Sequence, residues 1–104
     1  MPDPATKRRQ LMDLLRARRW TTYELANALD IPEREVEAHL PHVVRSLART
    51  PGSTFLIEPS VCEHCGFRFR TRTRFTRPGR CPTCRSESIT APRFEIAVDE
   101  PRTR

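Results

Sequence analysis

Apolar side chains near the start of the chain recur at the spacing of α-helices. The first stretch with this spacing covers residues 5–18, and its apolar positions are Leu11, Met12, Leu14 and Leu15. The second covers residues 22–29 and is preceded by Thr21, which stands three residues before Glu24 as in a capping box. We therefore expect two helices, separated by a short connection that contains Trp20.

A third apolar stripe extends over residues 33–48 and starts next to Pro32, a residue type that suits the first turn of a helix. The stripe consists of Val36, Leu40, Val43, Val44 and Leu47. Pro41 removes one backbone donor within the stretch, so we expect this third helix to be bent or broken there.

The second half of the chain begins and ends with short apolar runs that are typical of strands. Thr50-Pro51-Gly52-Ser53 is a turn signal, and residues 55–58 follow it as a predicted strand. Residues 93–98 alternate strictly between polar and apolar side chains, which indicates a half-buried strand. Two strands after three helices predict a hairpin that packs on the helices.

This order of elements is typical of an α+β fold, the winged helix-turn-helix, in which three helices are followed by a two-stranded wing. We expect the winged helix-turn-helix to comprise residues 5–60 and 89–98, with residues 61–88 inserted in the wing. Residues 99–104 read as a flexible tail. A different packing of three helices and a hairpin is the alternative.

The composition adds an excess of positive charge to this picture. Of the 104 residues, 19 are basic and 13 are acidic, which gives a net charge of +6, and Lys7 is the only lysine. The planar fork of arginine suits phosphate groups and guanine edges, so a nucleic-acid partner is favoured over a merely solvated basic surface. The chain has no apolar run of the kind found in membrane spans and signal peptides, so we expect a cytoplasmic protein.

The four cysteines form two pairs of identical spacing. Cys62 and Cys65 make the first pair, and Cys81 and Cys84 make the second after an interval of fifteen residues. Two Cys-x-x-Cys turns that face each other supply four thiolates in tetrahedral geometry, the ligand set of a structural zinc site. Cysteines in a reducing cytoplasm are metal ligands more often than disulfides. We therefore predict a zinc ribbon that holds one structural Zn²⁺ ion.

Two other interpretations of the cysteines are an iron site, since iron also binds four thiolates, and a redox or disulfide pair. His64 lies inside the first pair, but four thiolates already complete the coordination sphere, so we expect this imidazole to face solvent. A closed four-thiolate site leaves no open position for water or substrate. The sequence also lacks paired carboxylates and a nucleophile with a base, so we do not expect an enzyme.

Arginines alternate with other residues just after the first cysteine pair. Over residues 67–75, phenylalanine and threonine occupy one parity, and the other parity consists of Arg68, Arg70, Arg72 and Arg74. As a strand, this segment would have an aromatic face packed on the metal-binding turns and an arginine face. Residues 62–85 contain seven arginines and one acid, which favours contact with the phosphate backbone of double-stranded DNA. RNA and a solvated strand edge are the alternatives.

The third predicted helix also carries polar side chains that could enter a groove of DNA. Those off its apolar stripe are Arg34, His39, His42 and Arg45. Acidic side chains near its start, Glu33 and Glu35 among them, offset this positive charge. A solvated surface or a dimer interface is the alternative for this face.

Several motifs resemble those of predicted archaeal-type transcriptional regulators in which a winged helix-turn-helix is fused to a zinc ribbon. In the helical half, the matching motifs are Tyr23-Glu24-Leu25-Ala26, Ile31-Pro32-Glu33-Arg34-Glu35-Val36, His42 and Arg45-Ser46-Leu47. In the cysteine half, they are Ile57-Glu58-Pro59, Cys62, Cys65-Gly66-Phe67, Arg80-Cys81-Pro82-Thr83-Cys84, Ser86-Glu87 and Pro92-Arg93-Phe94. The resemblance covers residues 7–98, and the chain departs from it at Pro41 and at Asp30, where such turns often have glycine.

The resemblance implies DNA-binding transcriptional regulation, with the ribbon in the place of a simple wing. It also implies that the zinc ligands are Cys62, Cys65, Cys81 and Cys84. We expect a homodimer, because two copies of one small module double the length of DNA that is contacted. The alternatives are an RNA- or protein-binding zinc-ribbon adaptor of a transcription or translation assembly, and a rubredoxin-like electron carrier.

Overall fold

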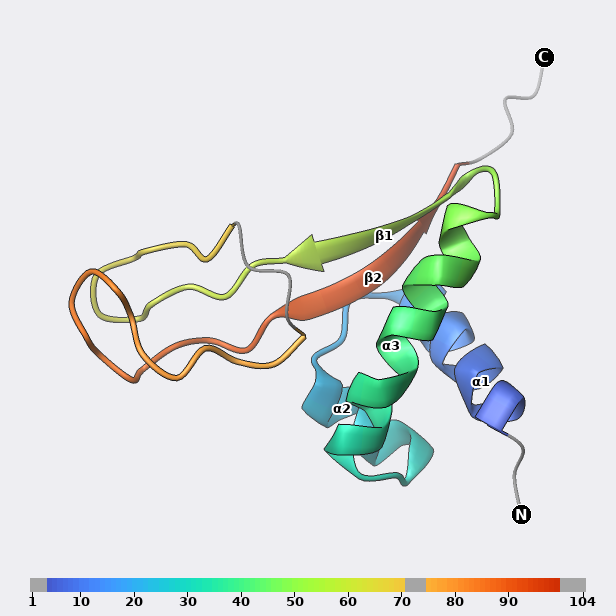
Figure 1. The fold of residues 1–104 in the computed structure, drawn as a ribbon, viewed down its shortest axis with the longest axis horizontal. Helices are drawn as coiled ribbons and strands as arrows, with labels where there is room; N and C mark the ends of the chain where they lie inside the picture. The colour runs from blue at the N-terminus through green and yellow to red at the C-terminus, as the bar shows by residue number, and fades with distance from the viewer. Residues whose placement is uncertain (1–3, 71–74, 100–104) are drawn as a thin grey trace.

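Three helices lie beside one two-stranded sheet in the computed structural model, which describes residues 4–70 and 75–99 (Figure 1). The elements are α1 (Pro4–Ala17), α2 (Thr22–Leu29), α3 (Glu33–Ala48), β1 (Ser53–Glu58) and β2 (Arg93–Val98). All three predicted helices and both predicted strands are therefore confirmed, and the fold is α+β. None of the described helices combines the length and the apolar character that a membrane crossing requires.

Both ends of α2 are capped, and the second cap turns the chain sharply into α3. The Thr21 hydroxyl accepts a hydrogen bond from the Glu24 N–H at 3.1 Å, and the Glu24 carboxylate accepts one from the Thr21 N–H at 2.9 Å. The predicted capping box is therefore confirmed. After α2, Asp30 adopts the left-handed conformation with φ of 55°, and the Ile31 N–H donates to the Ala26 carbonyl at 3.0 Å. Asp30 thus adopts the left-handed conformation that glycine adopts at the end of many helices.

α3 runs without interruption through Pro41, so of the two predicted outcomes the break is wrong, and the bend stays a prediction. The proline is exposed, while Leu40 and Val43 on either side are buried in the core. A proline inside a helix costs about 3 kcal/mol or more. Burial of the long apolar stripe of α3, at about 1.5–3 kcal/mol for each large aliphatic side chain, offsets that cost.

β2 forms backbone hydrogen bonds along both of its edges. β1 pairs with it antiparallel along one edge, in a register that sets Glu58 opposite Arg93. On the other edge, the Trp20 N–H donates to the Phe94 carbonyl at 2.9 Å, and the Phe94 N–H donates to the Trp20 carbonyl at 2.8 Å. The indole Nε1 of Trp20 donates to the Leu14 carbonyl at 2.7 Å. The connection between α1 and α2 therefore acts as a third, very short strand.

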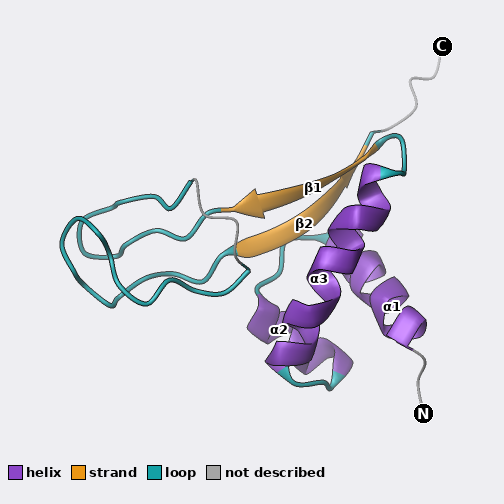
Figure 2. Cartoon of the chain, in the orientation of Figure 1, coloured by secondary structure: helices purple, strands orange, loops and turns teal. Residues whose placement is uncertain are grey.

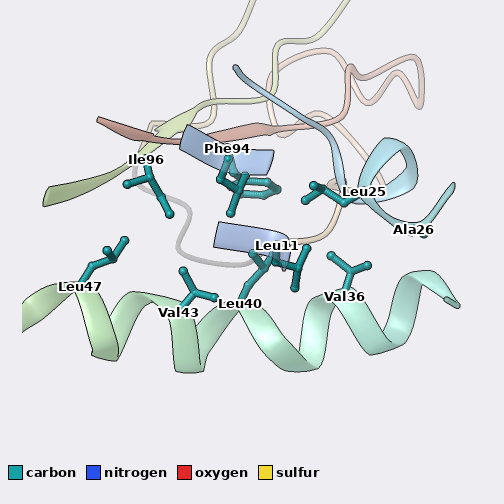
Figure 3. Close-up of a cluster of buried hydrophobic side chains, with 10 residues drawn as sticks. Leu11, Leu25, Ala26, Val36, Leu40, Val43, Leu47, Phe94 and Ile96 are labelled. Carbon is teal, nitrogen blue, oxygen red and sulfur yellow. The ribbon is translucent and has the colours of Figure 1, made fainter. Parts of the chain in front are cut away.

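The core lies between α3 and the sheet. The buried stripe of α3 consists of Val36, Leu40, Val43 and Leu47. Figure 3 shows this stripe pointing toward Phe94 and Ile96 of β2, with Leu11 of α1 between them. Val44, which the sequence places in the stripe, is exposed at its edge. α1, α3 and the sheet thus share one core, to which α2 adds Leu25.

Residues 59–92 connect β1 to β2, and their described parts, 59–70 and 75–92, extend beyond one end of the sheet (Figure 1). Figure 2 shows the described part of this segment, which we call the ribbon, as loops and turns. Isolated bridges join Val61 to Arg68 and Cys62 to Ile89. A segment with so little regular structure needs another source of stability, and the cysteines lie within it.

The continuous strand predicted over residues 67–75 is absent from the part of this segment that the structure describes. Phe67 and Phe69 pack edge to face with ring centroids 5.0 Å apart, and Phe69 contacts the buried cluster around the cysteines. The prediction of an aromatic face on the metal-binding turns is therefore correct for Phe69.

Phe75 takes a different position, so the same prediction is wrong for this residue. Its ring lies 6.2 Å from that of Phe55 and 5.6 Å from that of Phe94, centroid to centroid, in edge-on geometry. Phe75 therefore packs on the core formed by the helices and the sheet and anchors the ribbon to it.

Candidate functional site

The four cysteine sulfurs converge at one place in the ribbon. The sulfur atoms of Cys62, Cys65, Cys81 and Cys84 all lie within 4.8 Å of one another. The Sγ atoms of Cys62 and Cys84 are 3.5 Å apart, and those of Cys65 and Cys81 are 3.6 Å apart. A tetrahedral zinc ion with Zn–S bonds of 2.3 Å would set its sulfur ligands about 3.8 Å apart. The cluster therefore fits one tetrahedral ion, and the predicted meeting of the two cysteine pairs is confirmed.

The first cysteine pair sits on a tight turn over residues 62–67. The Cys62 N–H donates to the Phe67 carbonyl at 2.9 Å, and the Gly66 N–H donates to the Cys62 carbonyl at 2.9 Å. Gly66 has a φ of 82°, which glycine adopts without steric cost. The turn directs both of its sulfurs to the same side.

The second cysteine pair repeats this turn over residues 81–86. The Cys81 N–H donates to the Ser86 carbonyl at 2.9 Å, and the Arg85 N–H donates to the Cys81 carbonyl at 2.8 Å. The position that Gly66 holds in the first turn is taken here by Arg85, with φ of 64°. The Thr83 N–H also points at the Cys81 sulfur, at 3.4 Å. The two turns are thus one motif used twice. The sequence shows only their shared Cys-x-x-Cys spacing, because Arg85 stands where the first turn has Gly66.

Arg85 provides a test of this geometry, since a side chain at positive φ is strained. We expect Arg85→Gly to bind zinc as before and to unfold with a free energy that is unchanged or up to about 1 kcal/mol higher. Arg85→Val removes the same charge but places a β-branched side chain at positive φ, so it should lose about 1–3 kcal/mol. Urea denaturation of the zinc-loaded proteins measures the difference. Equal stability of the two variants would argue against a left-handed backbone at this position.

The protonation of the thiols depends on the turns that carry them. The N–H of Cys65 lowers the pKa of Cys62. Burial disfavours the Cys81 thiolate, but the backbone N–H groups of Cys84 and Thr83 outweigh it, and the pKa of Cys81 falls to about 6. The Ser86 N–H favours the Cys84 thiolate, yet burial and the three neighbouring thiols raise the pKa of Cys84 to about 12. Four thiolates at one place repel one another, and a bound divalent cation compensates that charge.

Among the described residues of the ribbon, few buried apolar side chains surround the sulfurs. Cys62 and Cys81 are buried, and with Ile89 they form a cluster to which Phe69 adds a partly buried ring. Two of the three buried members are therefore ligands themselves. His64 is exposed and lies outside the sulfur cluster, as expected from the sequence.

Comparison with known proteins matches both halves of the chain. A family model described as "PF0610-like, N-terminal" matches residues 6–56, and one described as "PF0610 rubredoxin-like zinc beta-ribbon domain" matches residues 59–102. The solution NMR structure of protein PF0610 from Pyrococcus furiosus is 33% identical in sequence and superposes with a TM-score of 0.72, over 92% of this chain and 92% of that chain. The chain belongs to the PF0610-like family. No functionally curated protein matches it.

The cysteine cluster of this PF0610-like chain is the site of one structural zinc ion, as the ribbon description and the sulfur geometry agree. The family models treat the ribbon as a separate C-terminal domain, which includes β2. The predicted division at residues 61 and 88 would instead assign β2 to the helical half, where Phe94 and Ile96 contribute to the core. That division stays a prediction.

The four side chains of α3 that the sequence predicts to contact nucleic acid differ in their exposure. Arg34, His42 and Arg45 are exposed. His39 is only 8% exposed and accepts a hydrogen bond at its Nδ1 from Arg8 Nε of α1 at 3.4 Å. Burial, and then the charge of Arg8, lowers the pKa of His39. The placement of His39 off the apolar stripe is therefore wrong; its position three residues after Val36 signals this.

Two arginines, Arg8 and Arg45, lie near the exposed ring of His42 in this PF0610-like protein. The His42 Nδ1 lies 3.3 Å from Nη2 of Arg45. The charge of Arg8, slight burial and the charge of Arg45 lower the pKa of His42. Glu33 is bound by the Thr22 hydroxyl of α2 at 2.8 Å. Glu33, one of the acidic side chains that offset the positive charge of α3, therefore contacts α2.

The ribbon arginines of the predicted row are described only in part. Arg68 and Arg70 are exposed, while Arg72 and Arg74 lie outside the described residues. Among the described residues, neither Arg68 nor Arg70 has an acid within ion-pair distance, whereas Arg80 pairs with Glu87 at 3.3 Å.

Proposed function

We propose that this PF0610-like protein binds double-stranded DNA and regulates transcription in the cytoplasm. In this proposal α2 and α3 act as a helix-turn-helix, β1 and β2 are the wing, and the zinc ribbon extends the wing. The protein acts as a homodimer and is not an enzyme, because a zinc ion with four thiolates has no open position for a substrate.

The connection between α2 and α3 supports a helix-turn-helix. A turn of only three residues, Asp30 to Pro32, joins the two helices, and its left-handed first residue is typical of sharp helix connections. Pairing of Trp20 with β2 adds a short strand between the first two helices. A short strand there, a helix-turn-helix and a hairpin together favour the winged form of this fold.

The observation that carries the proposal is a group of cations beside the second half of α3. Arg8 and Arg45 both lower the pKa of His42, while the acids of α3 lie in its first half, at Glu33, Glu35 and Glu37. Exposed cations on the second helix after a tight turn are an arrangement that recognition helices use in the major groove. The exposed ribbon arginines Arg68 and Arg70, and Arg72 and Arg74 of the same predicted row, would contact phosphates beside it.

The test is duplex binding by fluorescence anisotropy, with duplexes first selected from a random pool. We expect sequence-selective binding that survives moderate salt. Arg45→Gln should weaken binding by about 5- to 150-fold, because a contact to a base edge contributes about 1–3 kcal/mol.

Arg19→Gln is the matched control, since it removes the same charge elsewhere. Arg19 pairs with Glu58 at 2.9 Å and with Glu95, on the face of the sheet turned away from the core. We expect its affinity to stay within about twofold of the parent. Equal losses in the two variants, or equal binding to RNA and to any duplex, would favour the RNA- or protein-binding ribbon adaptor instead.

A further inference from the structure

A second basic feature lies between α1 and α3, which run side by side in Figure 1. It is a surface hollow of about 370 Å³. The hollow is lined by Ala5, Arg8, Arg9, Met12 and Arg16 of α1 and by Ser46 of α3. Three arginines and one serine therefore line one space, and Met12 is the largest apolar residue beside them.

The charge of this hollow is poorly compensated. Within the described part of the chain, the only ion pair of its three arginines joins Arg16 to Asp13 at 3.3 Å, and both groups are well exposed. Arg8 and Arg9 have no acid within ion-pair distance among the described residues. Several cations that line one hollow without acidic partners attract an anion more strongly than a single cation does.

A hydrogen bond holds the Arg8 side chain in place before any ligand binds. Its Nε donates to Nδ1 of His39, a buried imidazole, at 3.4 Å. His39 accepts this bond only in its neutral form, and burial, then the Arg8 charge, lowers the pKa of His39 and so favours that form. A guanidinium fixed at Nε keeps the N–H groups at its far end for a second acceptor. Less side-chain freedom is then lost when a ligand binds.

We propose that this hollow is an anion site that takes a phosphate or diphosphate group. The planar fork of arginine matches phosphate oxygens, and Ser46 adds one hydroxyl donor. The lining contains no aromatic ring for a base to stack on, so the recognised group is the phosphate itself. The group could belong to the backbone of a duplex or to a small phosphorylated compound. The site itself does not depend on the DNA-binding proposal, because free anion is sufficient to detect it.

The probe is inorganic pyrophosphate, added to the zinc-loaded full chain at constant ionic strength. Binding is followed by calorimetry and by the NMR titration of the His42 ring. We expect saturable one-to-one binding and a rise in the pKa of His42, because the anion offsets the charge of Arg8 that lowers it. No saturation and an unchanged His42 titration would overturn the proposal.

Two variants separate the hollow from the general charge of the protein. Arg9→Gln removes a lining cation without touching His39 and should weaken pyrophosphate binding at least tenfold. Arg49→Gln removes the same charge just after α3, outside the residues that line the hollow, and should change the affinity less than twofold. Equal losses would mean non-specific attraction to a basic protein and would overturn the site.

A competition experiment distinguishes the two sources of the phosphate group. If a selected duplex displaces pyrophosphate and Arg9→Gln also weakens duplex binding, the hollow holds a backbone phosphate. If pyrophosphate binds equally well to the duplex-bound protein, the hollow holds a small phosphorylated ligand. Both results support the anion site. Pyrophosphate binding without any duplex binding would contradict only the proposed function.

Discussion

Cys81→Ser is expected to abolish zinc binding and to unfold the ribbon while the helices keep their structure. A serine hydroxyl does not ionise near neutral pH, so the ion would lose one of its four anionic ligands. The buried cluster of the ribbon consists of Cys62, Cys81 and Ile89, so little apolar contact remains once the metal leaves. The free energy of structural zinc binding, about 10–16 kcal/mol in zinc-finger peptides, is then no longer available for folding. The helical core contains none of the cysteines and should remain.

Native mass spectrometry measures the zinc content of this variant, and NMR measures the order of each half of the chain. We expect one zinc per chain in the parent and close to none in Cys81→Ser. The control is His64→Ala, which alters an exposed side chain inside the first turn but outside the sulfur cluster, and it should retain one zinc. A Cys81→Ser protein with full zinc content and an unchanged melting temperature would show that the cluster is not the metal site.

Phe94→Ala is expected to lower the free energy of unfolding by about 3–5 kcal/mol, most of the stability of a small domain. Phe94 is fully buried, and its ring stacks on Phe55 at a centroid distance of 5.9 Å. It also meets the ring of Phe75, at 5.6 Å. Its removal would therefore leave a cavity at the point where the sheet, α3 and the ribbon join.

Urea unfolding of the zinc-saturated protein, followed by circular dichroism, measures this loss. Phe67→Ala is the matched control, because Phe67 is 37% exposed and its ring pairs with Phe69 rather than with the core. Its cost should be about 1 kcal/mol. If the two variants lose equal stability, the aromatic contact between ribbon and core contributes little.

The helices, the strands and the cysteine cluster were predictable because each rests on a local signal. The stripe of α3, the capping box at Thr21 and the alternation over residues 93–98 each occupy one continuous stretch of chain. The repeated Cys-x-x-Cys spacing is equally local, and two such turns meet most readily around one ion.

The parts that the sequence did not predict depend on contacts between distant segments. Alternation over residues 67–75 suggests a strand, but Phe75 buries its ring beside Phe55 and Phe94 instead. His39 is polar, yet α1 supplies Arg8 as a hydrogen-bond partner for it, which makes its burial possible. Likewise, α3 can continue through Pro41 because the whole apolar stripe of this helix is buried, which offsets the cost of the proline. Local propensity gives no information about such partners.

The position of Trp20 has a practical consequence for following this molecule in solution. It is the only tryptophan of the chain, so intrinsic fluorescence arises mainly from one indole. That indole is hydrogen-bonded to α1 and covered by the Arg18 guanidinium, 3.5 Å from the ring centroid, while its backbone is paired with β2. Its emission therefore reports whether the edge of the sheet is docked on the helices, without any added label. The cysteines lie in the ribbon. If removal of zinc by a chelator changes the emission of Trp20, loss of the metal alters the edge of β2 as well as the ribbon.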